Sequence, residues 1–432
     1  MRRLLASLVL LVGIWLAFYH LARAQTAVHV DVLTVKGPIN PVVAGYIDRG
    51  IKEAERDDAV CVIVEMDTPG GLMDAMRDIV QDIVSARVPV VVYVSPPGAR
   101  AASAGVFIAM ASHVSAMAPN TNIGAAHPVD TSGGEIPATM NQKVTNDAVA
   151  SVRSLAERRG RNADWAEKAV RESISSPERE ALEQRVVDLV TDNLATLLVD
   201  LEGRSVTLAS GTVALHTKGA AVNRIAMTPV ESFLDLISNP NIAYILMVLG
   251  VNGLIFELSN PGAILPGVVG GICLLLAFYA LGTLPINYAG LALIIFAFVL
   301  FIVEVKAPTH GLLTTGGIVA MFLGSLLLIN STAPYFTISR ELIAAVVGLT
   351  AAFFVFVVGA ALRAQRRRVT TGREGLVGQV GVAKAALAPS GTILVDGELW
   401  EATSLSGRIE PGQRVRVIEV DGLRLKVKAQ EQ

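Results

Sequence analysis

The 432-residue chain is poor in charged side chains and in cysteine. Only 17% of its residues are Asp, Glu, Lys or Arg and the formal net charge is −2, so a nucleic-acid partner is not expected. Two cysteines cannot form a disulfide framework. Cys61 lies in a β-type run and Cys273 in a run of membrane length, so we expect both thiols to be unpaired.

Motifs that bind metals or nucleotides are missing as well. The sequence contains no H-E-x-x-H pair and no Walker loop. We therefore expect no metal ion, no nucleotide and no other cofactor. Chemistry driven by ATP is disfavoured on the same ground.

Apolar residues are abundant instead. They make up 52% of the chain, and the mean hydropathy is +0.53, which predicts a large membrane part. We place an all-α membrane domain of about five helices at residues 229–365, opening with an interfacial amphipathic helix at Pro229–Ser238. Its five apolar runs approach spanning length and lie at residues 242–258, 263–283, 288–303, 312–330 and 342–362.

The two flanks of these runs predict the orientation of the chain. Residues 1–24 combine a basic start, an apolar stretch and an A-x-A end, as in a signal peptide, with an uncleaved anchor as the alternative. The arginines that follow the last run, at positions 363, 366, 367 and 368, favour a cytoplasmic location. Because five spans are odd in number, the domain at 25–228 should lie outside the inner membrane and the C-terminal domain in the cytoplasm.

The domain at 25–228 has the pattern of an α/β fold. Its β-type runs alternate with helical patterns at the spacing of a mainly parallel sheet. The runs lie at 28–35, 59–66 and 88–94, and the helices at 41–56 and 73–86. Ligand sites in such sheets lie beyond the carboxyl ends of the strands, where Gly70-Gly71 and Ser103 fall.

Ser103 is the candidate nucleophile. It lies in the small-residue segment Pro96–Ala118, where a strand, a sharp turn and a helix follow one another. Such a turn can present a serine hydroxyl and nearby free N–H groups to an oxyanion. The alternative is a buried packing helix in which Ser103 only hydrogen-bonds the preceding turn.

A nucleophilic serine needs a base, and three residues are candidates. His113 lies ten residues along the same helix and is too far away. His127 is the commoner kind of base, with Asp130 as a possible orienting acid. Lys143 would act only as a neutral amine, which burial and the positive end of a helix expected at Asn146–Arg159 would favour. These residues alone leave His127 and Lys143 open.

The sequence of the C-terminal domain, residues 372–432, predicts a small five-stranded barrel of the OB-fold type. Its short alternating strands are separated by glycine turns. Positive and negative side chains balance there, and Trp400 is its one aromatic residue, so a nucleic-acid stacking platform is not expected. A protein-interaction role is favoured.

Several segments resemble the NfeD family of membrane-bound serine proteases, whose protease domain has the Clp-protease/crotonase fold. They include DTPGG, GARAASAG, MAPNTNIGAAHPV, SNPNIAYILMVLG, LPINYAG and PSGTILVDGELWEA. The resemblance implies Ser103 as nucleophile and Lys143 as general base, with an oxyanion hole formed by Gly70, Gly71 and Ala104. The histidine of Clp proteases aligns with Ala126; His127 is one residue off and should face away, which disfavours a Ser-His-Asp triad.

The same resemblance implies an ATP-independent serine endopeptidase that cleaves hydrophobic segments of stomatin-like membrane proteins. It further implies contact with membrane lipid, and we expect a homo-oligomer. The alternative is a non-catalytic membrane scaffold for stomatin-like or flotillin-like proteins. A crotonase-type acyl-CoA enzyme shares the fold but is disfavoured by export, since CoA is cytoplasmic.

Overall fold

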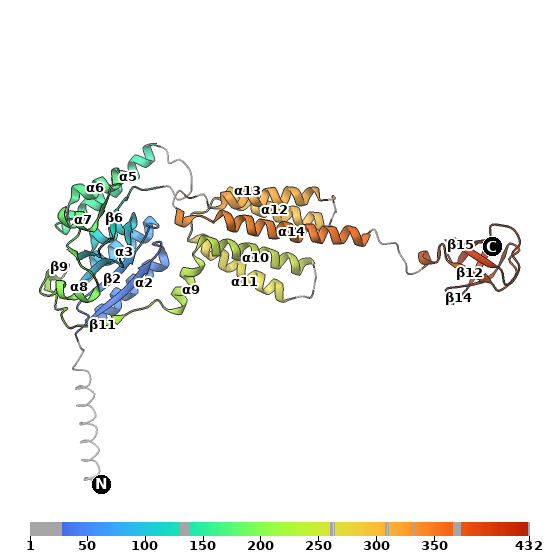
Figure 1. Ribbon diagram of the computed structural model, residues 1–432, viewed down its shortest axis with the longest axis horizontal. Coiled ribbons are helices and arrows are strands. Elements are labelled where there is room, and N and C mark those ends of the chain that lie inside the picture. Colours follow the sequence, from blue (N-terminus) through green and yellow to red (C-terminus); the bar gives the residue numbers. More distant parts are fainter. Residues whose placement is uncertain are drawn as a thin grey trace, which may run out of the picture. The chain divides into compact units, whose positions relative to one another are not determined.

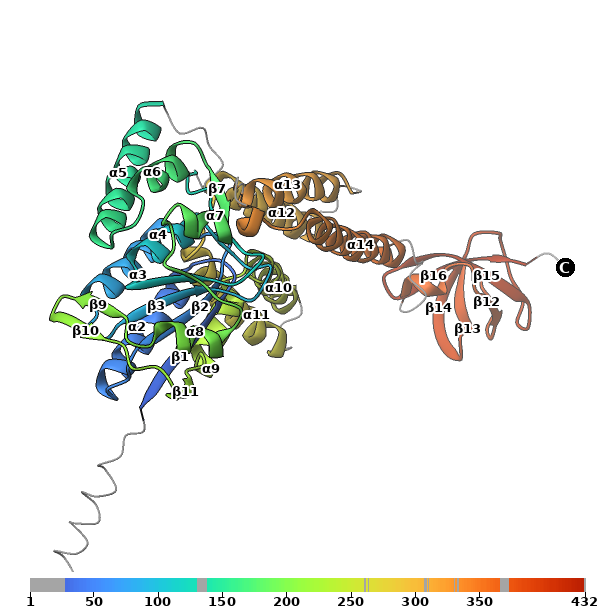
Figure 2. The ribbon, with the colours of Figure 1, turned by 60° about the vertical axis from the view of Figure 1, so that its left-hand side comes forward.

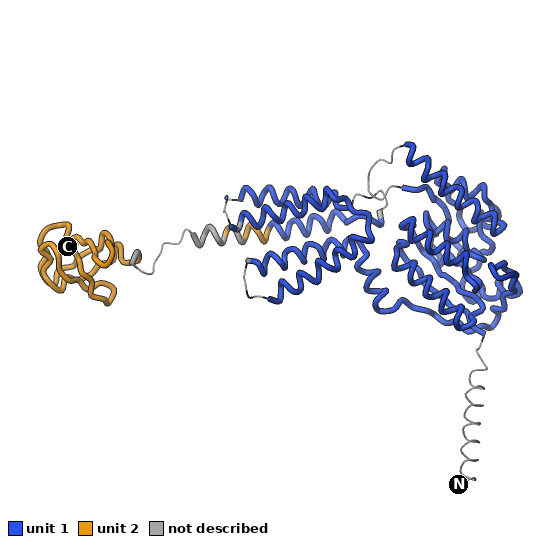
Figure 3. Tube along the Cα trace, turned by 180° about the vertical axis from the view of Figure 1, so that it is seen from behind, with its two compact units in different colours: residues 1–351 blue, residues 352–432 orange. Residues whose placement is uncertain are grey.

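The computed structural model describes residues 28–129, 138–259, 262, 264–306, 309, 311–329, 331, 334–365 and 373–430. The expected signal peptide at 1–24 lies outside the described residues and stays a prediction. The chain divides into two compact units, residues 1–351 and 352–432 (Figure 3).

A six-stranded parallel sheet organises the first unit (Figure 1). Its order is β11-β1-β2-β3-β5-β8, and every neighbouring pair is parallel. The expected α/β class with a mainly parallel sheet is therefore confirmed. The strands are β1 (His29–Lys36), β2 (Val62–Asp67), β3 (Val90–Val94), β5 (Val114–Met117), β8 (Leu189–Val190) and β11 (Ala221–Arg224).

Both faces of the sheet are covered, which explains why its strands read as unbroken apolar runs. Every residue of β3 is buried, and its side chains alternate between two hydrophobic clusters. The larger cluster joins the sheet to α2 (Pro41–Arg56), α3 (Met73–Ser85) and α4 (Ala104–Ala111). The smaller cluster joins the opposite face to α8 (Leu194–Leu201).

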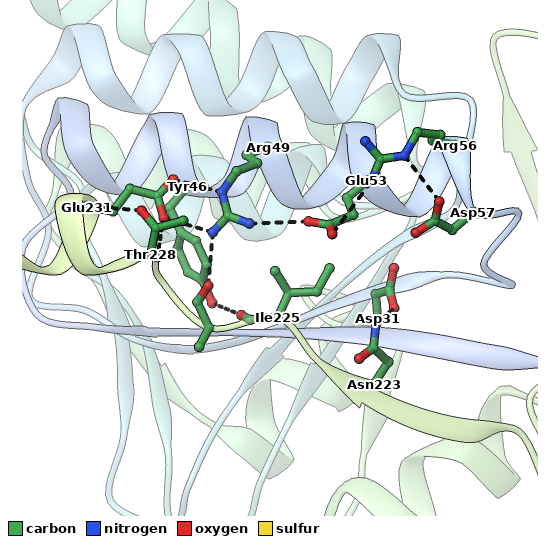
Figure 4. A network of polar contacts seen from close by, with 11 residues as sticks. Asp31, Tyr46, Arg49, Glu53, Arg56, Asp57, Asn223, Ile225, Thr228 and Glu231 are labelled. Atoms are coloured by element: carbon green, nitrogen blue, oxygen red, sulfur yellow. Dashed lines mark hydrogen bonds and ion pairs between the residues drawn. The ribbon is translucent and has the colours of Figure 1, made fainter.

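The edge strand β11 is fixed to β1 by side chains as well as by the ladder. Asn223 donates a hydrogen bond of 2.8 Å to Asp31 Oδ1, which is buried (Figure 4). Burial raises the pKa of Asp31. Tyr46 on α2 donates to the Ile225 carbonyl at 2.6 Å, just past the end of β11. The returning chain is thus held against the first strand and the first described helix.

The rest of the α/β domain lies around this sheet. It comprises β4 (Arg100–Ala102), β6 (Asn122–Gly124), β7 (Ser175–Pro177), α5 (Ala138–Arg158), α6 (Ala163–Arg171), α7 (Glu178–Glu183), β9 (Ser205–Leu208) and β10 (Gly211–Ala214). Strands β4, β6 and β7 form a separate three-stranded sheet.

The expected start of a helix at Asn146 is wrong. Helix α5 already includes Ala138, so Lys143 lies inside it and does not precede it. No proline or glycine interrupts the chain between these positions, and the Thr145 hydroxyl donates to Asn141 Oδ1 within the helix. Neither Thr145 nor Asn146 therefore caps the helix.

Helix α9 (Pro229–Ile237) begins where an interfacial amphipathic helix was expected. Thr228 and Glu231 form a capping box, which satisfies free N–H groups at the first turn. Val230, Phe233 and Leu236 are exposed along it.

Five helices follow, as the apolar runs predicted: α10 (Pro240–Ser259), α11 (Leu265–Gly282), α12 (Tyr288–Lys306), α13 (Leu312–Leu328) and α14 (Arg340–Gln365). By length and composition, 240–258 and 265–282 could cross a membrane, and 288–304 and 312–328 are shorter apolar helices. Glycines bring paired helices close: a Cβ added at Gly253 of α10 would lie 2.9 Å from the Gly270 Cα of α11.

The second unit contains the expected five-stranded barrel, which is closed (Figure 2). Its strands are β12 (Val380–Ala383), β13 (Ser390–Val395), β14 (Glu398–Ser404), β15 (Arg414–Asp421) and β16 (Arg424–Ala429). Aliphatic side chains fill the core of the barrel. Trp400 is partly buried and packs against this core. Both cysteines of the chain are free thiols, as expected, and burial raises the pKa of Cys61 to about 12.

Candidate active site

Ser103 lies at the turn that leads from β4 into α4, as the N-cap of that helix. Its backbone has φ 52° and ψ −112°, in the left-handed half of conformational space that residues other than glycine rarely adopt. The Ser103 N–H donates to the carbonyls of Gly124 (3.3 Å) and Ala125 (3.2 Å), which hold the turn in place. Strain of this kind at a strand-to-helix turn is typical of an exposed nucleophile.

Small residues are required after Ser103 because α4 is wholly buried. A Cβ added at Gly105 would come within 2.8 Å of Thr68 Cγ2, in the segment that follows β2. Close packing therefore brings the two turns, after β2 and after β4, against each other. Gly70-Gly71, after β2, and Ser103, after β4, thus lie close together: a Cβ added at Gly70 would be 2.6 Å from Ser103 Cβ.

The Gly70-Gly71 turn leaves one backbone donor available. The Gly70 N–H donates to Thr68 Oγ1 at 3.1 Å and is therefore already engaged. In the part of the chain that the structure describes, the N–H groups of Gly71 and Ala104 have no backbone acceptor. A Cβ at Gly71 would lie 2.1 Å from the Ile39 carbonyl oxygen, so only glycine fits there.

A pocket of about 140 Å³ opens over Ser103. Gly71 and Ala104 line it together with Ser103, so three of the predicted site residues meet in one place. Arg77 and Asp147, which form an ion pair with each other, are the charged residues of its lining. The remaining lining is largely apolar and includes Leu72, Met73, Met76, Phe107, Ala126, Pro128, Val129 and Ala148.

The two histidines near the site take structural positions. Ala126 lines the pocket, whereas the His127 Nδ1–H donates to the Val170 carbonyl at 2.8 Å. His113 is buried and accepts from the Val90 N–H at 3.0 Å. Burial, together with the nearby charges of Arg159 and Arg161, lowers the pKa of His113 to about 3. Asp130, the possible partner of His127, lies outside the described residues.

Lys143 is exposed on α5 and is not part of the pocket lining. The structure thus does not bring Lys143 into the pocket beside Ser103, and the burial expected for it is absent. Asp147, Ala148 and Ser151 of the same helix do line the pocket. Since residues four apart share a helix face, Lys143 lies on the pocket side of α5, one turn before Asp147.

Sequence reasoning missed Tyr335, which also lines the pocket. It belongs to η1 (Pro334–Phe336), between α13 and α14, more than 200 residues from Ser103 in the chain. The only local signal is a pair of aromatic residues in the short break between two apolar runs. Among the described residues, no group of three or more His, Cys, Asp or Glu could hold a metal ion.

Domain families match the chain in three successive parts. They are NfeD1b, N-terminal domain, over residues 29–213; the NfeD integral membrane domain, over 241–360; and the NfeD-like C-terminal, partner-binding domain, over 373–428. The membrane-bound protease PH1510 of Pyrococcus horikoshii is 39% identical over 99% of this chain and 98% of its own length. The chain belongs to the NfeD family. It is therefore a membrane protein, with its integral membrane domain at 241–360.

Other NfeD relatives extend the comparison. The membrane protein NfeD1b of Bacillus subtilis is 29% identical over 94% of this chain and 93% of its own. Among solved structures, a variant of the 1510-N membrane-bound stomatin-specific protease, in complex with a substrate peptide, is 37% identical. It covers 49% of this chain and 99% of its own, with a TM-score of 0.46.

Proposed function

We propose that this NfeD-family chain is a serine endopeptidase anchored in the membrane, with Ser103 as its nucleophile. The observation that carries the proposal is the strained turn at Ser103, which opens on a pocket also lined by Gly71 and Ala104, whose N–H groups have no backbone acceptor among the described residues. Its relative of 39% identity is named a membrane-bound protease. A hydroxyl with backbone N–H donors close by is the arrangement that acyl transfer requires.

The reaction follows from these groups. The Ser103 hydroxyl would attack the carbonyl carbon of the scissile peptide bond while a base removes its proton. Negative charge then develops on the carbonyl oxygen, where the N–H groups of Gly71 and Ala104 would stabilise it, with Gly70 shaping the turn. The base returns its proton to the amine as the peptide bond breaks, and water hydrolyses the acyl-enzyme.

Lys143 is the base that we propose, forming a Ser-Lys dyad. Its support is its place on the pocket side of α5, one turn before the lining residue Asp147, together with its long flexible side chain. His127 is the weaker candidate, because its Nδ1 is hydrogen-bonded to Val170, outside the pocket. Catalytic contacts are often loose before substrate binds, so the exposed position of Lys143 does not argue against this role.

The mainly apolar pocket lining favours hydrophobic peptide segments as substrates. We propose stomatin-like membrane proteins as the substrate class, the class that the name of the 37% identical protease specifies for that protein. The proposed enzyme works without ATP or metal, with the protease domain outside the inner membrane and the barrel in the cytoplasm. Membrane lipid and further copies of the chain are its other proposed partners.

A non-catalytic scaffold is the second candidate. It is favoured by the match of residues 373–428 to a partner-binding domain family, which needs no protease activity. In that case the barrel and the membrane helices would assemble stomatin-like proteins, and Ser103 would be a packing residue.

Cleavage of synthetic apolar peptides by the full-length protein in detergent tests the proposal. Ser103→Ala should abolish both cleavage and labelling by a serine-reactive fluorophosphonate. Ser85→Ala is the matched control, because that hydroxyl is bonded within its own helix, to the Gln81 carbonyl at 2.8 Å. Equal activity of the Ser103→Ala and wild-type proteins would leave the scaffold as the better account.

A further inference from the structure

The segment between α13 and α14 reaches the pocket above Ser103. Its η1 turn is anchored by Phe336, whose side chain is buried, and the ring of Tyr335 lies beside it with a centroid separation of 5.0 Å. Tyr335 itself is half-buried and lines the pocket. The membrane domain therefore supplies one wall of a site whose other residues all come from the α/β domain.

The hydroxyl of Tyr335 lies next to the nucleophile. A Cβ placed on Gly70 would be 2.8 Å from the Tyr335 hydroxyl oxygen and 3.1 Å from Ser103 Oγ. The two oxygens thus flank a single point at the Gly70 turn. Any peptide whose carbonyl carbon comes within about 3–3.5 Å of Ser103 Oγ must pass close to the tyrosine hydroxyl.

This hydroxyl has no hydrogen-bond partner among the residues that the structure describes. A tyrosine that is this far buried ordinarily finds one. Burial raises the pKa of Tyr335, against the opposing effect of Arg100, so the hydroxyl keeps its proton at neutral pH. It is a hydrogen-bond donor at the wall of the pocket that holds Ser103.

We propose that Tyr335 is a substrate-positioning residue, whose hydroxyl donates a hydrogen bond to a main-chain carbonyl of the bound peptide next to the scissile bond. Consecutive residues of an extended peptide are about 3.3–3.6 Å apart, so the neighbouring carbonyls fall within reach of this donor when the scissile one is at Ser103. The ring supplies apolar contact to the same stretch. This inference rests on the proposed protease activity.

The arrangement has a consequence for the substrate. A peptide that reaches Ser103 contacts the extramembrane turn of the membrane domain at the same time. The binding site is complete only when the α/β domain and helices α13 and α14 are folded together in one molecule.

Steady-state cleavage of an apolar peptide by the full-length protein in detergent tests the inference. Tyr335→Phe removes only the hydroxyl and should lower kcat/KM about fivefold, mainly through KM, since one hydrogen bond to the bound peptide is lost. Tyr335→Ala should lower it further. Tyr288→Phe is the matched control, because it removes a hydroxyl from an exposed tyrosine of the same domain that does not line the pocket.

Binding of the same labelled peptide to Ser103→Ala protein, measured by fluorescence anisotropy, gives a second readout. Adding Tyr335→Phe to that background should weaken binding by a similar factor and leave the melting temperature unchanged. Equal kcat/KM for Tyr335→Phe and wild type would overturn the inference while the protease proposal stands. Faster cleavage by Tyr335→Ala would also overturn the inference, because it would show that the Tyr335 side chain obstructs substrate binding. If the wild-type protein neither binds nor cleaves the peptide, the protease proposal is refuted, and this inference is refuted with it.

Discussion

Arg49 of α2 and Glu231 of α9 form a two-point ion pair, in which Nε–Oε1 and Nη2–Oε2 are both 2.8 Å (Figure 4). The paired Glu231 also closes the capping box at Thr228. We predict that Arg49→Met lowers the free energy of unfolding by about 1–2 kcal/mol, because both bonds to Glu231 are lost, together with those to Glu53 and the Ala226 carbonyl. A lower melting temperature of the full-length protein in detergent would show this, and Lys52→Met, on an exposed side chain, should have little effect.

The same pair should respond to acid. The Arg49 hydrogen bond is the chief cause that lowers the pKa of Glu231 below its ordinary value. Its stabilisation is therefore fully present above the unfolded-state pKa of about 4.3 and is lost as the pH falls through the lower folded value. The difference in melting temperature between wild type and Arg49→Met should be largest at pH 7 and should shrink as the pH falls below about 4.3. Part of it should remain, because Arg49 also donates to the Ala226 carbonyl at 2.9 Å, which does not titrate. A difference of the same size at low and at neutral pH would contradict the ion-pair origin.

His113 should make the α/β domain sensitive to acid at a higher pH than the Arg49–Glu231 ion pair does. Its folded-state pKa is lowered to about 3, so below pH 6.5 the unfolded chain binds a proton that the native state refuses. Stability should fall by about 1.4 kcal/mol per pH unit across this window, or roughly 2–3 kcal/mol at pH 4.5. His113→Asn keeps an acceptor for the Val90 N–H but cannot titrate, so its melting temperature should vary less with pH.

The control for that series is His216→Asn, at an exposed histidine. It should keep the pH dependence of the wild type. The same slope in His113→Asn as in wild type would show that other groups cause the acid sensitivity.

Gly71→Ala should remove most of the activity. The added Cβ would meet the Ile39 carbonyl oxygen at 2.1 Å, so the turn must shift and its N–H moves away from the developing oxyanion. Loss of one such donor typically costs about 10²–10³ in kcat. Gly45→Ala on α2 is the matched control, since its Cβ would meet nothing within 4 Å. A kcat near wild type for a folded Gly71→Ala protein would exclude Gly71 from the oxyanion hole.

The identity of the base can be decided with three variants. Lys143→Ala and Lys143→Arg should both be inactive, because guanidinium stays protonated and cannot accept the Ser103 proton. His127→Ala should keep most of its activity, because the His127 Nδ1–H is engaged with the Val170 carbonyl. Inactive His127→Ala, alongside cleavage by either Lys143 variant, would replace the Ser-Lys dyad with a Ser-His pair. Circular dichroism should first show that each variant is folded.

Local sequence patterns predicted the strands whose side chains are buried in a regular pattern along the whole strand. The apolar run at 88–94 predicted β3, because both faces of that strand are buried. The alternating pattern in the C-terminal domain predicted the strands of the closed barrel. Strand β11 was missed because its four residues are all exposed and gain strand structure only by pairing with β1. Tertiary contacts, which no local pattern records, created it.

The site was predictable to the extent that its residues lie in the two turns. Ser103, Gly71 and Ala104 could be placed together because parallel strands deliver both turns to one edge of the sheet. Tyr335 could not, since its position depends on how a distant helical hairpin packs. The start of α5, and with it the exposure of Lys143, was missed because polar residues without a breaker can extend a helix by several turns.

The connection from β11 to α10 is short and is held by side-chain contacts. Arg224 ends the last strand, the Ile225 carbonyl is bonded to Tyr46, Thr228 caps α9, and α10 begins at Pro240. If the chain is the protease that we propose, this short connection would limit how far from the membrane its site can act. The distance of a peptide bond from the bilayer would then contribute to substrate selection, in addition to the sequence around that bond.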